Sequence, residues 1–256
     1  LLHCFLEDED RQSLRALVRG AAAGAPAEQR LEGLIPTPGL PGRLLEELAA
    51  QPAVRDLAAR LTIWRHPYAA AVAAGVGIGE PDLFRIEAEL NRSFAERATL
   101  GARDGTMALR HHVAELIDGD NILTALLLVG TAPEWPVEQA FCPGGWRLTP
   151  ERFAAAARAP DRHRASVMLA QTIGDQALAR RIRRYGATPA RLESALREAQ
   201  HAALAVKARL DPLSEAPLLE YLYRLRGQAE RITMAIWAAA MDAPPATAER
   251  LLGGTS

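Results

Sequence analysis

The chain has 256 residues, of which 49% are hydrophobic and 5% aromatic, and its 30 basic and 31 acidic residues leave a formal net charge of -1. This balance excludes a protein that attracts nucleic acid or an acidic membrane through its overall charge, so a charged partner has to meet a local patch. The apolar runs near residues 69–78 and 122–129 are about half as long as the roughly 20 residues that a membrane span needs. Cys4 and Cys142 lack the spacing of a zinc site or a disulfide framework, which is typical of a cytoplasmic protein.

Apolar residues recur at helical spacing along the chain, and no stretch alternates with a period of two, so the sequence predicts an all-α fold. The first expected helix covers residues 8–21 and ends near Gly20 and Gly24. The second covers residues 83–97, with Asp82 as its N-cap. A longer third helix is expected over residues 106–129. Its apolar face comprises Leu109, Val113, Leu116, Ile117, Thr124 and Leu127, and Asn121 shares that face, which predicts a buried amide there.

The later part of the chain predicts helices that start at a threonine followed by proline, at residues 149–150 and 188–189. Proline is favoured at the first helical position because its missing N–H would have no partner there. The second of these helices is expected to end at Leu210, before the Asp211-Pro212 pair. Its inward residues are expected to be Leu192, Leu196, Ala199, Ala203 and Val206. The last helix, residues 218–241, has an apolar pattern with alternating steps of four and three, at Leu218, Leu222, Leu225, Ala229, Ile232 and Ile236.

Two segments of the chain resemble each other at an offset of 110 positions, from Asp8 to Gly20 and from Asp118 to Gly130 (118 − 8 and 130 − 20). Each segment leads to a proline-rich turn and then to another helix, and the last part of the chain repeats this plan more loosely. We therefore expect three similar helical units, arranged with pseudo-threefold symmetry as a funnel around a central hollow. Their ranges are residues 1–80, 81–188 and 189–256. The first unit has no counterpart of the helix over residues 83–97, so we expect a helix to precede Leu1.

Four stretches of the sequence carry a family resemblance. They are FRIEAELNRSF (84–94), LRHHVAELIDGDNILTALL (109–127), CPGGWRLTPERF (142–153) and LLEYLYRLRGQAERITMAIW (218–237). In this order they resemble the C subunit of archaeal and bacterial V/A-type ATPases, called d in the vacuolar enzyme. The chain departs from that family at Val129, where an arginine is expected, and at Arg11, which takes the place of the asparagine found in the second unit.

The resemblance implies a non-catalytic subunit without a cofactor or a metal ion. It implies a funnel that sits on the ring of membrane subunits and receives the tip of the central stalk, a heterodimer of D- and F-type subunits. Such a subunit would couple rotation to proton or sodium transport from the cytoplasmic face of the membrane, and would not bind nucleic acid. ATP chemistry and ion translocation would belong to other subunits.

Individual residues are also assigned roles. Structural roles are expected for Asp118, Asn121, Pro143, Gly144 and Gly145. The densest basic cluster, Arg180, Arg181, Arg183 and Arg184, could contact lipid headgroups or acidic loops of a partner, or could instead complement the C-terminal end of a helix. Tyr221 and Glu230 match the pattern of the family and are expected to contact partners, although they could simply be packed or solvated.

Two other classes of protein have to be weighed against this hypothesis. An α-helical enzyme would need a convergent set of polar residues, but His111 and His112 are adjacent and point apart, and the glycines of residues 75–79 follow no strand and precede no Gly-Lys pair. A helical scaffold or regulator that binds a peptide, a protein or nucleic acid would share the composition. It would not require three copies of one unit.

Overall fold

The computed structural model describes residues 2–131, 133–242 and 244, apart from the side chains of Glu230 and Trp237. All regular elements in this part of the chain are helices, which confirms the all-α prediction. They are α1 (Leu2–Ala22), α2 (Ala27–Leu31), α3 (Gly42–Ala49), α4 (Val54–Ile63), α5 (Ala69–Ala73), α6 (Leu83–Gly101), α7 (Met107–Leu128), the short 3-10 helix η1 (Val137–Ala140), α8 (Pro150–Ala157), α9 (Arg162–Thr172), α10 (Gln176–Tyr185), α11 (Pro189–Leu210) and α12 (Ala216–Ala240). None of the described helices is long and apolar enough to cross a membrane.

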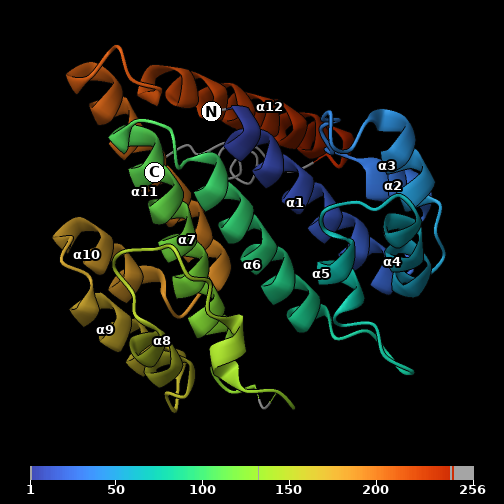
Figure 1. The fold of residues 1–256 in the computed structure, drawn as a ribbon, viewed down its shortest axis with the longest axis horizontal. Helices are drawn as coiled ribbons and strands as arrows, with labels where there is room; N and C mark the ends of the chain where they lie inside the picture. The colour runs from blue at the N-terminus through green and yellow to red at the C-terminus, as the bar shows by residue number, and fades with distance from the viewer. Residues whose placement is uncertain (1, 132, 243, 245–256) are drawn as a thin grey trace.

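Five long helices form the centre of the molecule, and shorter helices lie at its two sides (Figure 1). α1 packs on α6, α6 on α7, α7 on α11, and α11 on α12. The short helices α2 to α4 pack on α1, whereas α8 and α9 pack on α7. The core therefore has two parts, one built mainly around α1 and α3 to α6 and one around α7 to α11.

The row of long helices is closed by side chains that join α12 to α1. The rings of Phe5 and Tyr223 meet edge to face, with their centroids 5.4 Å apart. One turn further along α12, Arg226 reaches the acidic residues of α1, including Asp8 at 3.2 Å. The N-terminal and C-terminal helices are thus held together by an aromatic contact and by charges.

The ends of the helices agree with the capping signals in the sequence. Asp82 and Thr149 each accept a hydrogen bond from the backbone N–H three residues later, as N-cap residues do. Helices begin at Pro150 and Pro189, as predicted. The start of α1 was predicted wrongly, because the helix begins at Leu2 and not at Asp8. The error comes from the acidic run at residues 7–10. Four consecutive carboxylates are normally expected to face solvent, which does not fit an amphipathic helix, but here all four are buried.

The short helices that follow the two turns are spaced by 108 positions. The helices α3 and α8 have eight residues each, and they start at Gly42 and Pro150, while α4 and α9 start at Val54 and Arg162 (150 − 42 and 162 − 54). The offset of 110 between the segments Asp8–Gly20 and Asp118–Gly130 remains a prediction. The division into three units and their threefold arrangement as a funnel remain predictions.

Three predicted apolar faces also needed correction. On α7, Leu127 is 37% exposed, and on α11, Val206 is 45% exposed while Leu204 is fully buried. On α12, the buried residues include Ala216, Leu219 and Tyr223, whereas the stripe with steps of four and three is exposed except at the half-buried Leu222. Periodicity finds an amphipathic helix but cannot choose between two faces when both carry large apolar side chains.

Candidate functional site

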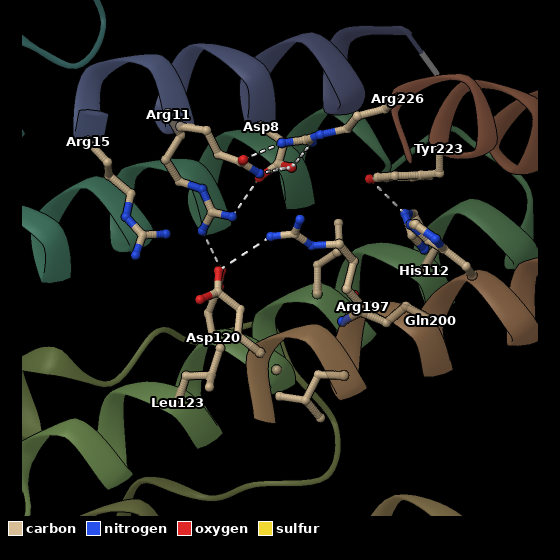
Figure 2. Close-up of a pocket in the computed structure, with 16 residues that line it drawn as sticks. Asp8, Arg11, Arg15, His112, Asp120, Leu123, Arg197, Gln200, Tyr223 and Arg226 are labelled. Atoms are coloured by element: carbon tan, nitrogen blue, oxygen red, sulfur yellow. Dashed lines mark hydrogen bonds and ion pairs between the residues drawn. The ribbon is translucent and has the colours of Figure 1, made fainter. Parts of the chain in front are cut away.

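A polar cavity lies where α1, α7, α11 and α12 converge (Figure 2). Its volume of about 70 Å³ is enough for roughly five water molecules. Its charged and polar lining comprises Asp8, Arg11, Gln12, Arg15, His112, Asp120, Glu193, Arg197, Gln200, His201, Tyr223 and Arg226. Segments that lie more than 200 residues apart in the chain therefore contribute to one site.

Arg11 is the central residue of this cavity. Its guanidinium group donates hydrogen bonds to Asn91 of α6 at 2.9 Å, to Asp8 of α1 at 2.5 Å, and to Asp120 of α7. Burial works against its charge, but the carboxylates of Asp120 and Asp8 outweigh it and raise the pKa of Arg11. One side chain thus links three long helices and stays charged at every accessible pH.

Arg226 extends the same network to α12. It pairs with Asp8 at 3.2 Å and with Glu9 at 2.8 Å, and it also donates to Gln12. Burial alone would raise the pKa of Asp8, but the guanidinium groups of Arg11 and Arg226 bring it down to about 2. We call these residues, Asp8, Glu9, Arg11, Asp120 and Arg226, the charged junction.

A neutral hydrogen bond lies beside the charged junction. His112 of α7 is fully buried, and its Nε2 lies 3.1 Å from the hydroxyl oxygen of Tyr223 of α12. Burial, with a smaller effect from Lys207, lowers the pKa of His112 to about 3, so the imidazole is neutral at physiological pH. This contact ties α7 to α12 without a further buried charge.

The outer part of the cavity is more exposed than its floor. The side chains of Arg197 and Glu193 are 39% and 47% exposed and lie 3.4 Å apart. Arg15 is 21% exposed and reaches Glu87 of α6. An ion pair as exposed as that of Arg197 with Glu193 contributes little to stability. We refer to Arg15, Glu193 and Arg197 as the mouth of the cavity.

The residues with expected structural roles form a second buried polar site, on α7. Asp118 accepts hydrogen bonds from the backbone N–H groups of the turn after the Pro-Gly-Gly sequence, at Trp146, Arg147 and Leu148. The amide of Asn121 donates to the carbonyl oxygen of Cys142 and accepts from its N–H, both at 2.8 Å. Burial raises the pKa of Asp118, and the backbone N–H groups oppose this effect. Both side chains therefore fasten one turn to α7.

The two glycines of this turn are required for different reasons. Gly144 has a φ of +112°, which side chains disfavour, and a Cβ at Gly145 would collide with the carboxylate of Asp118. Pro143 precedes them and cannot donate a hydrogen bond. The turn comes close to α7 because Gly145 has no side chain.

The four arginines near the end of α10 do not act alike. Arg181 packs against α11, where it donates to the carbonyl oxygen of Ala195 and lies 3.6 Å from Glu198. Arg180, Arg183 and Arg184 are exposed. None of the four lines the central cavity.

Of the two expected contact residues on α12, Tyr221 lies on the outward side of the helix. Tyr221 is 49% exposed, and the guanidinium carbon of Arg224 lies 5.8 Å from the centre of its ring. The side chain of Glu230 falls outside the described part of the structure. The role of each residue as a partner contact remains a prediction.

Sequence reasoning missed the charged junction. The Asp8-Arg11 spacing of three was visible as a local helix pair, but Asp120 and Arg226 are 109 and 215 positions away from Arg11 (120 − 11 and 226 − 11). Nothing in one sequence connects them. Because the charges of the junction are paired with one another, the junction is suited to fix the relative positions of the helices.

Comparison with known families gave one result. The family model described as "ATP synthase (C/AC39) subunit" matches residues 1–251, almost the whole chain. No curated protein matches the sequence.

Proposed function

The chain belongs to the C/AC39 subunit family of V/A-type ATP synthases, and from this premise we propose that it couples rotation of the central stalk to the membrane ring. Members of the family are accessory, non-catalytic stalk subunits of the rotary ATPase. The partners we propose are the heterodimer of D- and F-type subunits on one side and the ring of ion-carrying subunits on the other. The subunit would lie at the cytoplasmic face of the membrane, and the transported ion would be a proton or sodium.

The observation that carries this proposal is the charged junction. A coupling has to pass torque without deforming, and Arg11 and Arg226 hold four long helices together through buried ion pairs and hydrogen bonds. Breaking such a buried pair leaves a charge without a partner, which costs about 3–5 kcal/mol. The buried ion pairs therefore oppose sliding of α1 against α7 or α12. Apolar contacts alone would oppose it less, because they can re-form after a small shift.

We place the stalk at the mouth of the cavity. The three units, if they surround a common axis as the sequence predicts, would meet where α1, α7, α11 and α12 converge. The mouth offers charges of both signs, from the partly exposed Arg15, Glu193 and Arg197, next to the buried ion pairs of the charged junction. A partner would bind there by exchanging ion pairs with these side chains. The ring would contact the opposite face.

Size-exclusion chromatography with light scattering tests the proposal on the chain mixed with the purified stalk heterodimer of the same organism. We expect a one-to-one complex, and we expect the double variant Arg15→Glu, Arg197→Glu to weaken it at least tenfold. Arg85→Glu with Arg103→Glu is the matched control, because both residues are exposed and lie outside the cavity. If both double variants weakened the complex equally, the mouth of the cavity would not be the binding site of the stalk. If folded partners formed no complex at all, the proposed function would be rejected.

A further inference from the structure

The helices α9 and α10 form a hairpin at the edge of the molecule (Figure 1). They pack against each other, and Gly186 lies so close to Ser166 that a Cβ on the glycine would collide with its side chain. The C-terminal end of α10 therefore lies beside the N-terminal part of α9. This brings two separate groups of arginines to one end of the hairpin: Arg162 and Arg164 from α9, and Arg183 and Arg184 from α10.

The hairpin differs in charge from the rest of the chain. Residues 161–185 contain six arginines and two acidic residues, which gives +4 (6 − 2) in a chain whose net charge is -1. Both acids, Asp161 and Asp175, accept hydrogen bonds from backbone N–H groups at the starts of α9 and α10. The local excess of positive charge is thus not balanced within the hairpin.

Several of these arginines have no carboxylate partner. Arg164, Arg180, Arg183 and Arg184 are exposed, and no acidic group among the described residues lies within 4.0 Å of any of them. Arg184 instead lies over the ring of Tyr185, 5.2 Å from its centre. Their charged groups are free to meet a ligand. We call Arg162, Arg164, Arg180, Arg183 and Arg184 the basic tip.

Helix stability explains only part of the basic tip. Arg183 and Arg184 lie in the last turn of α10, where cations complement the helix dipole. Arg162 donates a hydrogen bond to the carbonyl oxygen of Leu126, in the last turn of α7. Arg164 lies in the first turn of α9, where only the N-cap Asp161 offsets the unfavourable interaction of a cation with the helix dipole. An external anion would give the exposed Arg164, Arg183 and Arg184 a common ligand.

We propose that the basic tip binds anionic lipid headgroups at the membrane surface, as a contact separate from the stalk and the ring. The guanidinium group matches phosphate oxygens with two parallel hydrogen bonds. The basic tip carries exposed arginines from both helices of the hairpin, which suits a broad charged surface. The central cavity, whose charges are paired, takes no part in this contact.

Vesicle sedimentation tests the proposal with the chain as it stands. The probes are vesicles of phosphatidylglycerol mixed with phosphatidylcholine, and vesicles of phosphatidylcholine alone. We expect binding only to the anionic vesicles, and weaker binding as salt is added. The triple variant Arg164→Gln, Arg183→Gln, Arg184→Gln should bind on the order of a hundredfold more weakly, since each basic residue near such a surface contributes about 1 kcal/mol.

The matched control removes the same charge from scattered exposed sites, with Arg43→Gln, Arg85→Gln and Arg103→Gln. It should keep nearly all of the vesicle binding, and circular dichroism should show that both variants are folded. No binding to anionic vesicles, or an equal loss in both variants, would overturn the proposal. Inorganic phosphate that binds the tip as tightly as vesicles would assign a free anion instead. Loss of the stalk complex in the tip variant alone, without loss of vesicle binding, would assign a protein partner.

Discussion

The charged junction and the turn held by Asp118 are two buried polar sites that act over different distances. At the junction, Arg11 and Arg226 pair with carboxylates on other helices. At the turn, Asp118 and Asn121 bind backbone groups that follow their own helix within 30 positions. The first site joins separate elements and the second closes one connection. Ion pairs join separate helices at the charged junction, whereas hydrogen bonds to the backbone hold the turn at Asp118.

This difference predicts the largest loss of stability at Arg11. Arg11→Met keeps the length of the side chain but leaves Asp8 and Asp120 without their shared partner. We expect the free energy of unfolding to fall by about 3–5 kcal/mol, because the buried carboxylates lose their compensating charge. Urea unfolding followed by circular dichroism measures this. A loss below about 1 kcal/mol would mean that the junction does not hold the helices together.

Removal of the amide at the turn should cost less. Asn121→Ala leaves the N–H and the carbonyl oxygen of Cys142 without partners, and we expect a loss of about 2–3 kcal/mol from two unsatisfied buried groups. The stalk complex should survive this change. If Asn121→Ala weakened stalk binding more than Arg11→Met did, the turn and not the junction would be the site that matters for assembly.

The acidic residues of α1 predict opposite responses to pH. The folded-state pKa of Asp8, about 2, lies below its ordinary value of 3.8, so its stabilising effect is present above about pH 4 and is lost as the pH falls toward 2. The loss should be roughly 2 kcal/mol.

Asp10 should respond in the other direction. Burial raises its pKa to about 6, despite the hydrogen bond from Thr37, so the protonated form favours the fold. Stability from Asp10 is therefore lost as the pH rises through 6. Urea unfolding as a function of pH should show a maximum between these limits. Asp8→Asn should abolish the fall on the acid side, and Asp10→Asn the fall toward neutral pH; unchanged profiles would contradict both assignments.

The smallest effect is expected at Asp118. Asp118→Asn keeps one acceptor oxygen for the backbone of the turn and removes a charge that burial disfavours. We expect a loss of about 1 kcal/mol or less. The comparable change at the junction, Asp8→Asn, should cost more, because two arginines lose a charged partner. Equal losses, measured by urea unfolding, would erase the distinction between the two sites.

The sequence predicted the local features of this fold better than its long-range ones. Caps at Asp82 and Thr149 and the helix starts at Pro150 and Pro189 depend on neighbouring residues, so one sequence contains their signals. The burial of residues 7–10 depends on partners such as Arg97 and Arg226. An acidic run is usually solvated, and only the fold shows which arginines neutralise it.

The same limit applies to the candidate sites. The Asp-x-x-Asn and Pro-Gly-Gly motifs pointed to the turn that the structure shows. The basic cluster was visible in part, but its structure differs from the expectation, because Arg181 binds α11 and the hairpin adds Arg162 and Arg164. Which arginines lie together depends on how α9 and α10 pack, and one sequence does not contain that information.

The central claim is that the charged junction holds the two sides of the molecule as one stiff body. Spin labels at cysteines placed at Glu46 of α3 and Arg180 of α10, both exposed, report the distance between these sides by pulsed electron resonance. Cys4 and Cys142 are buried and should stay unlabelled. We predict one narrow distance distribution, broadened by Arg11→Met and unaffected by Asp118→Asn. A broad distribution in the chain without the Arg11 change would contradict the account.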